Sequence, residues 1–189
     1  EAFDFYARLH LDNSRTFWQA NKATYDGPVK GSIQAALDEL ADYGPFSVFR
    51  PYRDVRFAKD KTPYKENAGA YGESQAGTGY YLALDANGLF AGAGYYQFAS
   101  DQMERFRTAV DAEATGGDLA AKAAALAKKG YNIGAISELK TAPRGYAKDH
   151  PRIEFLRRKG LFVGMEWPQA KWMHSKGALT KIRTVWEAA

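Results

Sequence analysis

Residues 79–98 read GYYLALDANGLFAGAGYYQF, two runs of strand-forming residues around a single turn. The runs are Tyr80–Asp85 and Leu89–Phe98, both rich in aromatic and aliphatic side chains. Between them stands Asn87-Gly88, a favoured residue pair for a tight two-residue turn. The pattern predicts a β-hairpin, around which the rest of the fold is built.

Helical patterns flank the hairpin on both sides. Ser14, with Asp12 and Asn13, offers side-chain oxygens that can cap a helix, which we expect to end at Gly27. Pro28 then suits the first turn of the next helix. In chain order, the expected helices are 2–10, 15–25, one from Pro28 to near Gly44, 101–113, one capped by Asp118 and ending before Gly130, a short one from His150, and a terminal helix with Leu179, Ile182, Val185 and Trp186 on its inner face.

Strand patterns elsewhere are shorter. Residues 52–58 alternate with a period of two and predict a strand, and further short strands are expected near 131–136 and at 161–163. Residues 59–78 are rich in Lys, Asp, Gly, Thr and Ser and are predicted to form a long loop, a kind of segment that is often functional. Helices, then strands, then more helices favour an α+β fold over a regular βαβ succession. We therefore expect a single domain over 1–189. In it, an antiparallel sheet packs against N-terminal, middle and C-terminal helices.

Bulk composition excludes several classes of protein. The 189 residues are 46% apolar and 25% charged, which is ordinary for a soluble globular protein. No apolar run approaches the length of a membrane span, and no signal-peptide pattern opens the chain. There is no cysteine, and the histidines at 10, 150 and 174 do not have metal-ligand spacing. We expect a cytoplasmic protein without metal, cofactor or membrane association.

Positive charge is concentrated in two segments. Residues 50–65 and residues 138–159 each carry a net charge of +4, which is also the net charge of the whole chain. If the two segments meet in the fold, they form a surface that faces an anion. The alternative is a solvated surface on which these charges are neutralised by neighbouring carboxylates.

Residues 52–65, YRDVRFAKDKTPYK, resemble the signature of an uncharacterised family of bacteria and fungi called domain of unknown function 2461. The resemblance covers nearly the whole chain and implies a compact single domain, but it supplies no activity, substrate or catalytic residue. The segment 159–162, KGLF, departs modestly from the family pattern. Other matching pieces are Asn13, Arg15, Phe17-Trp18 and Asn21-Lys22, then GYYL at 79–82, GLFAG at 88–92, PRGY at 143–146 and DHP at 149–151.

The candidate ligand-binding residues come from the two basic segments. Arginine offers a planar fork for carboxylate or phosphate, and lysine offers a point charge. Asp54, which lies between two arginines, is expected to orient guanidinium groups, because nearby positive charge depresses its pKa and weakens it as a base. The full set is Arg53, Asp54, Arg56, Lys59, Lys61, Tyr64, Lys65, Arg144 and His150.

Two members of this set have an equally simple structural role. Tyr64 follows Pro63, which can hold its hydroxyl in place, but its ring can equally pack in the core. His150 can donate to an anion or shuttle a proton, or it can be a first-turn helix residue. A single site that joins Arg56, Lys61, Arg144 and His150 requires the two basic segments to converge.

Three functions remain open from these residues. The first is binding of a phosphorylated or carboxylated small ligand in a basic pocket beside the hairpin. Gly92 and Gly94 of the hairpin would let a ligand or another backbone approach closely. The residue pattern is compatible both with binding alone and with a catalysed reaction. The second is nucleic-acid binding, favoured by 14% aromatic residues and two basic segments, although no known reader motif occurs. The third is a structural or protein-interaction role. Phosphate-loop, dinucleotide, nucleophile-elbow and zinc-protease patterns are absent.

Overall fold

An antiparallel sheet of six strands lies at the centre of the computed structural model, which describes residues 1–74 and 77–189. The order of the strands across the sheet is β1-β2-β3-β4-β6-β5, and each neighbouring pair is antiparallel. The α+β class predicted from the sequence is confirmed. The strands are β1 Phe46–Val48, β2 Asn67–Glu73, β3 Thr78–Asp85, β4 Gly88–Tyr95, β5 Asn132–Gly134 and β6 Leu161–Pro168.

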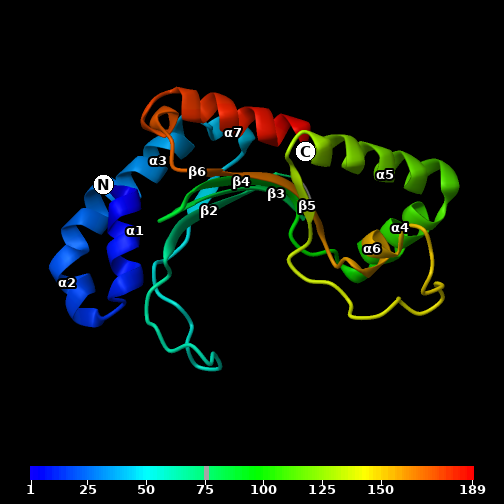
Figure 1. Cartoon of the computed structure of the whole chain (residues 1–189), viewed down its shortest axis with the longest axis horizontal. Helices are drawn as coiled ribbons and strands as arrows, with labels where there is room; N and C mark the ends of the chain where they lie inside the picture. The colour runs from blue at the N-terminus through cyan, green and yellow to red at the C-terminus, as the bar shows by residue number, and fades with distance from the viewer. Residues whose placement is uncertain (75–76) are drawn as a thin grey trace.

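Helices cover one face of this sheet and one end of it (Figure 1). The helices α1, α3 and α7 pack on the covered face, while α4, α5 and α6 form a group beyond β5. The opposite face is concave, and no helix of the described chain covers it (Figure 1). No described helix is long and apolar enough to cross a membrane. The helices are α1 Ala2–Leu11, α2 Arg15–Thr24, α3 Lys30–Asp38, α4 Ser100–Asp111, α5 Glu113–Lys128, α6 Ile153–Arg157 and α7 Gly177–Ala188, with a π-helical turn at Tyr25–Val29.

Side-chain alternation along the strands assigns each residue to a face. On β3, Leu82 and Leu84 are buried in the core under the helices, whereas Tyr81 and Asp85 point to the concave face. We call this concave side the open face. Because a shift of one residue would exchange the two sets, burial of the leucines also determines which side chains reach the open face.

The central hairpin forms as predicted, but its turn lies one residue earlier than the predicted pair Asn87-Gly88. Leu84 of β3 pairs with Leu89 of β4, and Ala86-Asn87 connect the two strands while Gly88 already belongs to β4. The Asp85 carboxylate stabilises the turn, since its Oδ1 accepts hydrogen bonds from the backbone N–H groups of Asn87 (2.7 Å) and Gly88 (3.1 Å). The stable centre of the sheet is therefore encoded locally.

Several of the predicted helix boundaries are wrong; the short helix expected from His150, for example, begins at Ile153. The helix expected to end at Gly27 continues through the π-helical turn Tyr25–Val29 directly into α3. Pro28 lies inside this turn, and the wider backbone accommodates a ring that lacks an N–H and would clash in a regular helix. Asp118 does not begin a helix, because α5 already starts at Glu113. Its carboxylate instead forms an ion pair with Lys122 one turn later, at 2.8 Å.

The strand predicted at 52–58 is also wrong. Within these described residues, only Tyr52 makes a β-type contact, a single bridge to Tyr64. The strand lies later, at β2, inside the segment 59–78 that was predicted to be a loop, and β3 begins at Thr78, the last residue of that segment. Residues 75–76 of the predicted loop lie outside the described residues. β2 is rich in glycine and alanine, which have low strand propensity, but it pairs with β1 on one side and β3 on the other. Pairing with both neighbours therefore overrides the local preference.

Candidate functional site

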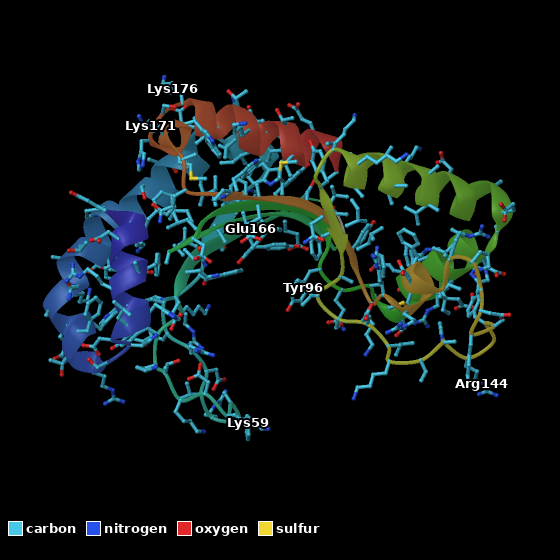
Figure 2. The ribbon with its side chains drawn as sticks, viewed as in Figure 1. Lys59, Tyr96, Arg144, Glu166, Lys171 and Lys176 are labelled. Carbon is cyan, nitrogen blue, oxygen red and sulfur yellow. The ribbon has the colours of Figure 1, made fainter. Side chains whose placement is uncertain are left out.

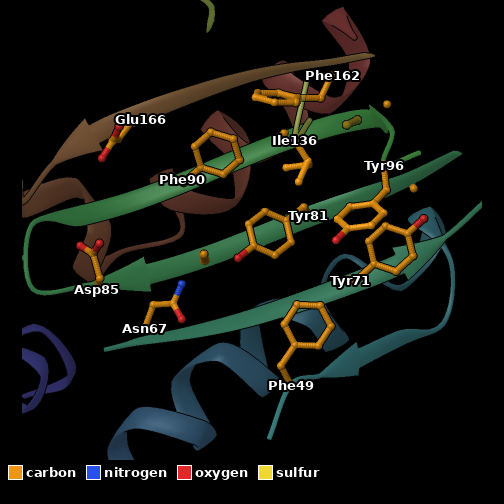
Figure 3. Close-up of a pocket in the computed structure, with 15 residues that line it drawn as sticks. Phe49, Asn67, Tyr71, Tyr81, Asp85, Phe90, Tyr96, Ile136, Phe162 and Glu166 are labelled. Carbon is orange, nitrogen blue, oxygen red and sulfur yellow. The ribbon is translucent and has the colours of Figure 1, made fainter. Parts of the chain in front are cut away.

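The open face is the floor of a cavity of about 690 Å³, which we call the aromatic cavity (Figure 3). This volume is in the range of small-molecule sites, which are about 300–1,000 Å³. The floor consists of β2, β3, β4 and β6, and residues outside the strands complete the wall. Six aromatic side chains dominate the lining: Phe49, Tyr71, Tyr81, Phe90, Tyr96 and Phe162.

Glycines allow these rings to lie across neighbouring strands. A Cβ atom added at Gly164 would lie 2.6 Å from the ring of Phe90, and one added at Gly79 would lie 2.3 Å from Tyr71. Both contacts are far shorter than van der Waals distance, so the rings occupy the space that side chains would take. The close approach predicted at Gly94 is made by the Leu161 carbonyl of β6, which would lie 2.2 Å from a Cβ atom there. The floor is therefore built of ring surfaces rather than of upright side chains.

Polar groups gather at one end of the aromatic cavity. Asn67, Asp85 and Glu166 lie together at the end remote from Tyr96 and Phe162 (Figure 3). Among the described residues, no lysine, arginine or histidine lines this cavity. Its charged lining is thus entirely acidic.

The hydroxyl of Tyr81 lies at the centre of this floor. Burial raises the pKa of Tyr81, and a side-chain hydrogen bond with Asn67 acts in the opposite direction. The phenol consequently stays neutral near pH 7 and offers a hydrogen-bonding group in the middle of an aromatic surface.

A second, more open depression adjoins the aromatic cavity and shares Asn67 and Asp85 with it. We call it the charged cavity, and its volume is about 530 Å³. It mixes both signs of charge, and some charges are already paired: His10 Nδ1 lies 2.7 Å from Glu66 Oε2. The hydrogen bond with Glu66 raises the pKa of His10. The remaining lining residues are Arg53, Asp60 and Lys65.

Lys65 differs from its neighbours in this cavity because no described carboxylate forms an ion pair with it. Its Nζ lies 5.1 Å from the centroid of the Phe49 ring, at the border between the two cavities. Partial burial lowers the pKa of Lys65, and the charge of Arg50 lowers it further. An anion placed beside Lys65 would relieve this repulsion.

The other cations of the segment 50–65 mostly have partners within it. Arg53 Nη1 donates to Asp60 (2.5 Å) and to Thr62 (2.6 Å). The Arg56 guanidinium forms a two-pronged pair with Asp54, at 2.9 and 2.6 Å, and this pair lowers the pKa of the Asp54 carboxyl. Lys61 Nζ donates to the Val55 carbonyl at 2.9 Å. These contacts brace the loop and engage the side chains that were predicted to face a ligand.

Tyr64 and His150 are used in packing. The Tyr64 ring is buried and stacks on Trp18, with centroids 4.2 Å apart, and burial raises its pKa. His150 is largely buried; its Nε2 lies 3.2 Å from Asp111, and its Nδ1 accepts from the backbone N–H of Arg152. Neither residue lines the two cavities.

The two basic segments do not converge. Lys59 and Arg144, both exposed, lie on opposite sides of the open face (Figure 2). The single site that would join Arg56, Lys61, Arg144 and His150 is therefore not formed. The physical reason is the sheet itself, because one segment precedes β2 near one edge and the other leads into β6 near the opposite edge.

Sequence reasoning missed most of the aromatic cavity. Tyr81 and Asp85 alternate with buried leucines, and this period-two pattern is a signal that could have found them. Phe49 and Glu166 carry no such signal, because only strand pairing brings them onto the same face. Among the described residues, no three His, Asp or Glu side chains are grouped closely enough to hold a metal ion.

Comparison with known proteins agrees with the resemblance seen in the motif at 52–65. No curated protein and no solved structure matches this chain significantly. A family model described as "Conserved hypothetical protein (DUF2461)" matches residues 1–189. The match spans the whole chain, so this protein is a member of the DUF2461 family.

Proposed function

We propose that the protein binds a small ligand that carries a phosphate or carboxylate group. The anionic group contacts Lys65, and the body of the ligand lies on the aromatic floor. The observation that carries this proposal is a lysine with no ion pair among the described residues, at the border of a cavity large enough for a small molecule.

Electrostatics favour Lys65 over the other candidates as the anion contact. Arg53 and Arg56 would have to give up charged partners within the loop to bind a ligand. Lys65 has no such partner to lose, and a hydrogen bond to a charged group contributes about 1.5–3 kcal/mol. Asp85 and Glu166 repel an anion from the acidic end of the aromatic cavity, so the anionic group is placed beside Lys65 and Phe49.

Calorimetric titration of the purified protein at low salt tests this proposal. Sugar phosphates, nucleotides and small carboxylates are compared on the wild type, on Lys65→Gln and on Lys59→Gln. Lys59→Gln is the matched control, because it removes the same charge at an exposed position outside both cavities. We expect one ligand class to bind the wild type and Lys59→Gln equally, and to bind Lys65→Gln at least tenfold more weakly. Equal affinity in all three proteins would contradict the proposal.

Nucleic-acid binding is a second candidate, supported by one arrangement. Basic segments flank the aromatic open face on both sides (Figure 2), and single-stranded nucleic acids bind surfaces that combine stacking rings with positive charge. The acidic end of the cavity opposes a phosphate backbone, which ranks this candidate second. Fluorescence anisotropy with a single-stranded oligonucleotide at about 50 mM and about 200 mM salt decides it, since such binding weakens steeply with salt. No binding at the lower salt concentration excludes it. If neither class of ligand binds, a structural or protein-interaction role remains.

A further inference from the structure

We infer that the ligand of this cavity also carries a positively charged group, an amine or quaternary ammonium, that lies beside the Phe90 ring at the acidic end of the aromatic cavity, facing Asp85 and Glu166. The inference rests on the proposed function, which places an anionic group at Lys65. Together they define the ligand as a small zwitterion.

The two carboxylates are not neutralised by the protein. Neither Asp85 nor Glu166 forms an ion pair with any described residue. Asp85 uses Oδ1 for the hairpin turn, and no described residue donates to its Oδ2. The described lining of the aromatic cavity thus holds these two negative charges and no positive charge, while Asp85 also borders the charged cavity that contains Lys65.

Strand register places Phe90 beside Glu166, while Asp85 lies diagonally across the sheet from Glu166. Phe90 on β4 pairs directly with Glu166 on β6, and β4 lies between β6 and β3, which carries Asp85. On its other side Phe90 pairs with Ala83, two residues from Asp85, so Asp85 and Glu166 are about 10 Å apart across the strands and about 7 Å apart along them. Both carboxylates lie toward the same end of the aromatic cavity, on one side of the Phe90 ring, so a cation at this end faces the two carboxylates beside the ring (Figure 3).

The rings attract the same sign of charge as the carboxylates. The face of an aromatic ring is negative, and cations bind it within about 6 Å of the centroid. Tyr81 and Phe90 are neighbours, with centroids 5.8 Å apart, and no described lysine or arginine lies over either ring. At the border of the same cavity, Lys65 already occupies the ring of Phe49 in this manner. Ring faces and carboxylates together favour a cation over a neutral sugar or an anion at this end.

Three probes separate the two ends of such a ligand: choline carries the cation alone, inorganic phosphate carries the anion alone, and phosphocholine carries both. Each is titrated calorimetrically into the wild type, Glu166→Gln, Phe90→Leu and Lys65→Gln. Glu104→Gln, an exposed carboxylate outside the cavity, is the control. Thermal unfolding of every variant establishes that it is folded.

We expect phosphocholine and choline to bind about tenfold more weakly to Glu166→Gln than to Glu104→Gln, and more weakly to Phe90→Leu. Inorganic phosphate should be unaffected by Glu166→Gln and weakened by Lys65→Gln. If choline does not bind the wild type, or Glu166→Gln behaves like Glu104→Gln, the inference is wrong. Phosphate binding that depends on Lys65, without choline binding, leaves the proposed function intact. Choline binding without phosphate binding refutes the proposed function and leaves a cation site.

Discussion

Replacing Gly164 by alanine tests whether the aromatic floor is built by rings that lie across glycines. The added Cβ would lie 2.6 Å from Cζ of Phe90 and 3.1 Å from the Ala91 carbonyl oxygen. The ring must therefore leave its position, while the backbone of β4 keeps the methyl group in place. The change acts on the cavity floor without altering any charge.

The expected magnitude follows from two opposing contributions. Overpacking of this kind costs about 1–3 kcal/mol of unfolding free energy. Alanine in place of glycine in a strand returns about 0.5–1 kcal/mol, because the unfolded chain loses less conformational freedom on folding. Gly164→Ala alone should thus be destabilising by up to about 2.5 kcal/mol. In a Phe90→Ala background the clash is absent, and the same change should be neutral or stabilising.

Urea denaturation followed by tryptophan fluorescence measures all four proteins of this double-mutant cycle. Gly31→Ala is the control, because Gly31 lies in α3 with open space around the position of a Cβ atom, and it should stabilise by up to about 1 kcal/mol. A coupling energy near zero between Gly164→Ala and Phe90→Ala would refute the proposed ring-on-glycine floor.

Three further perturbations test the surrounding structure. Tyr64→Ala removes a buried ring stacked on Trp18 and should cost about 3–5 kcal/mol in chemical denaturation; a loss below about 1 kcal/mol would contradict a packing role. Arg152→Ala should lower the free energy of unfolding by about 2–4 kcal/mol, because the Arg152 guanidinium donates to the carbonyls of Val110 and Asp111 and pairs with Glu113. Arg152→Lys should not restore this stability, because an ammonium group cannot make the same set of hydrogen bonds as the planar guanidinium. Pairing with Glu66 raises the pKa of His10 in the folded protein, so the pair stabilises the folded state when His10 is protonated. This stabilisation is complete below the unfolded pKa of about 6.5, and it is lost as pH rises through the pKa of the folded state. The stability difference between the wild type and His10→Gln should therefore be largest below the unfolded pKa of about 6.5 and shrink as pH rises above it, and a difference that grows instead would show that the pairing is absent.

Local patterns in the chain determined the hairpin and the buried faces of several helices. The run Asp85-Ala86-Asn87-Gly88 forms the turn, and the alternation of Leu82 and Leu84 with Tyr81 sets which face is buried. These features depend on interactions between residues close in sequence, so a local pattern is sufficient. The motif at 52–65 likewise indicates the family, because its signature is one contiguous run of residues.

Only the tertiary structure decided the second strand and the cavity. β2 has a weak local preference and exists because β1 and β3 pair with its two edges. The same kind of pairing brings Glu166 onto the face that carries Phe90, and the width of the sheet separates Lys59 from Arg144. Charge composition showed that the basic segments exist, but their positions and their pairing with carboxylates depend on contacts between segments remote in the chain. A ligand site on an open sheet face is assembled from such contacts, which no local pattern encodes.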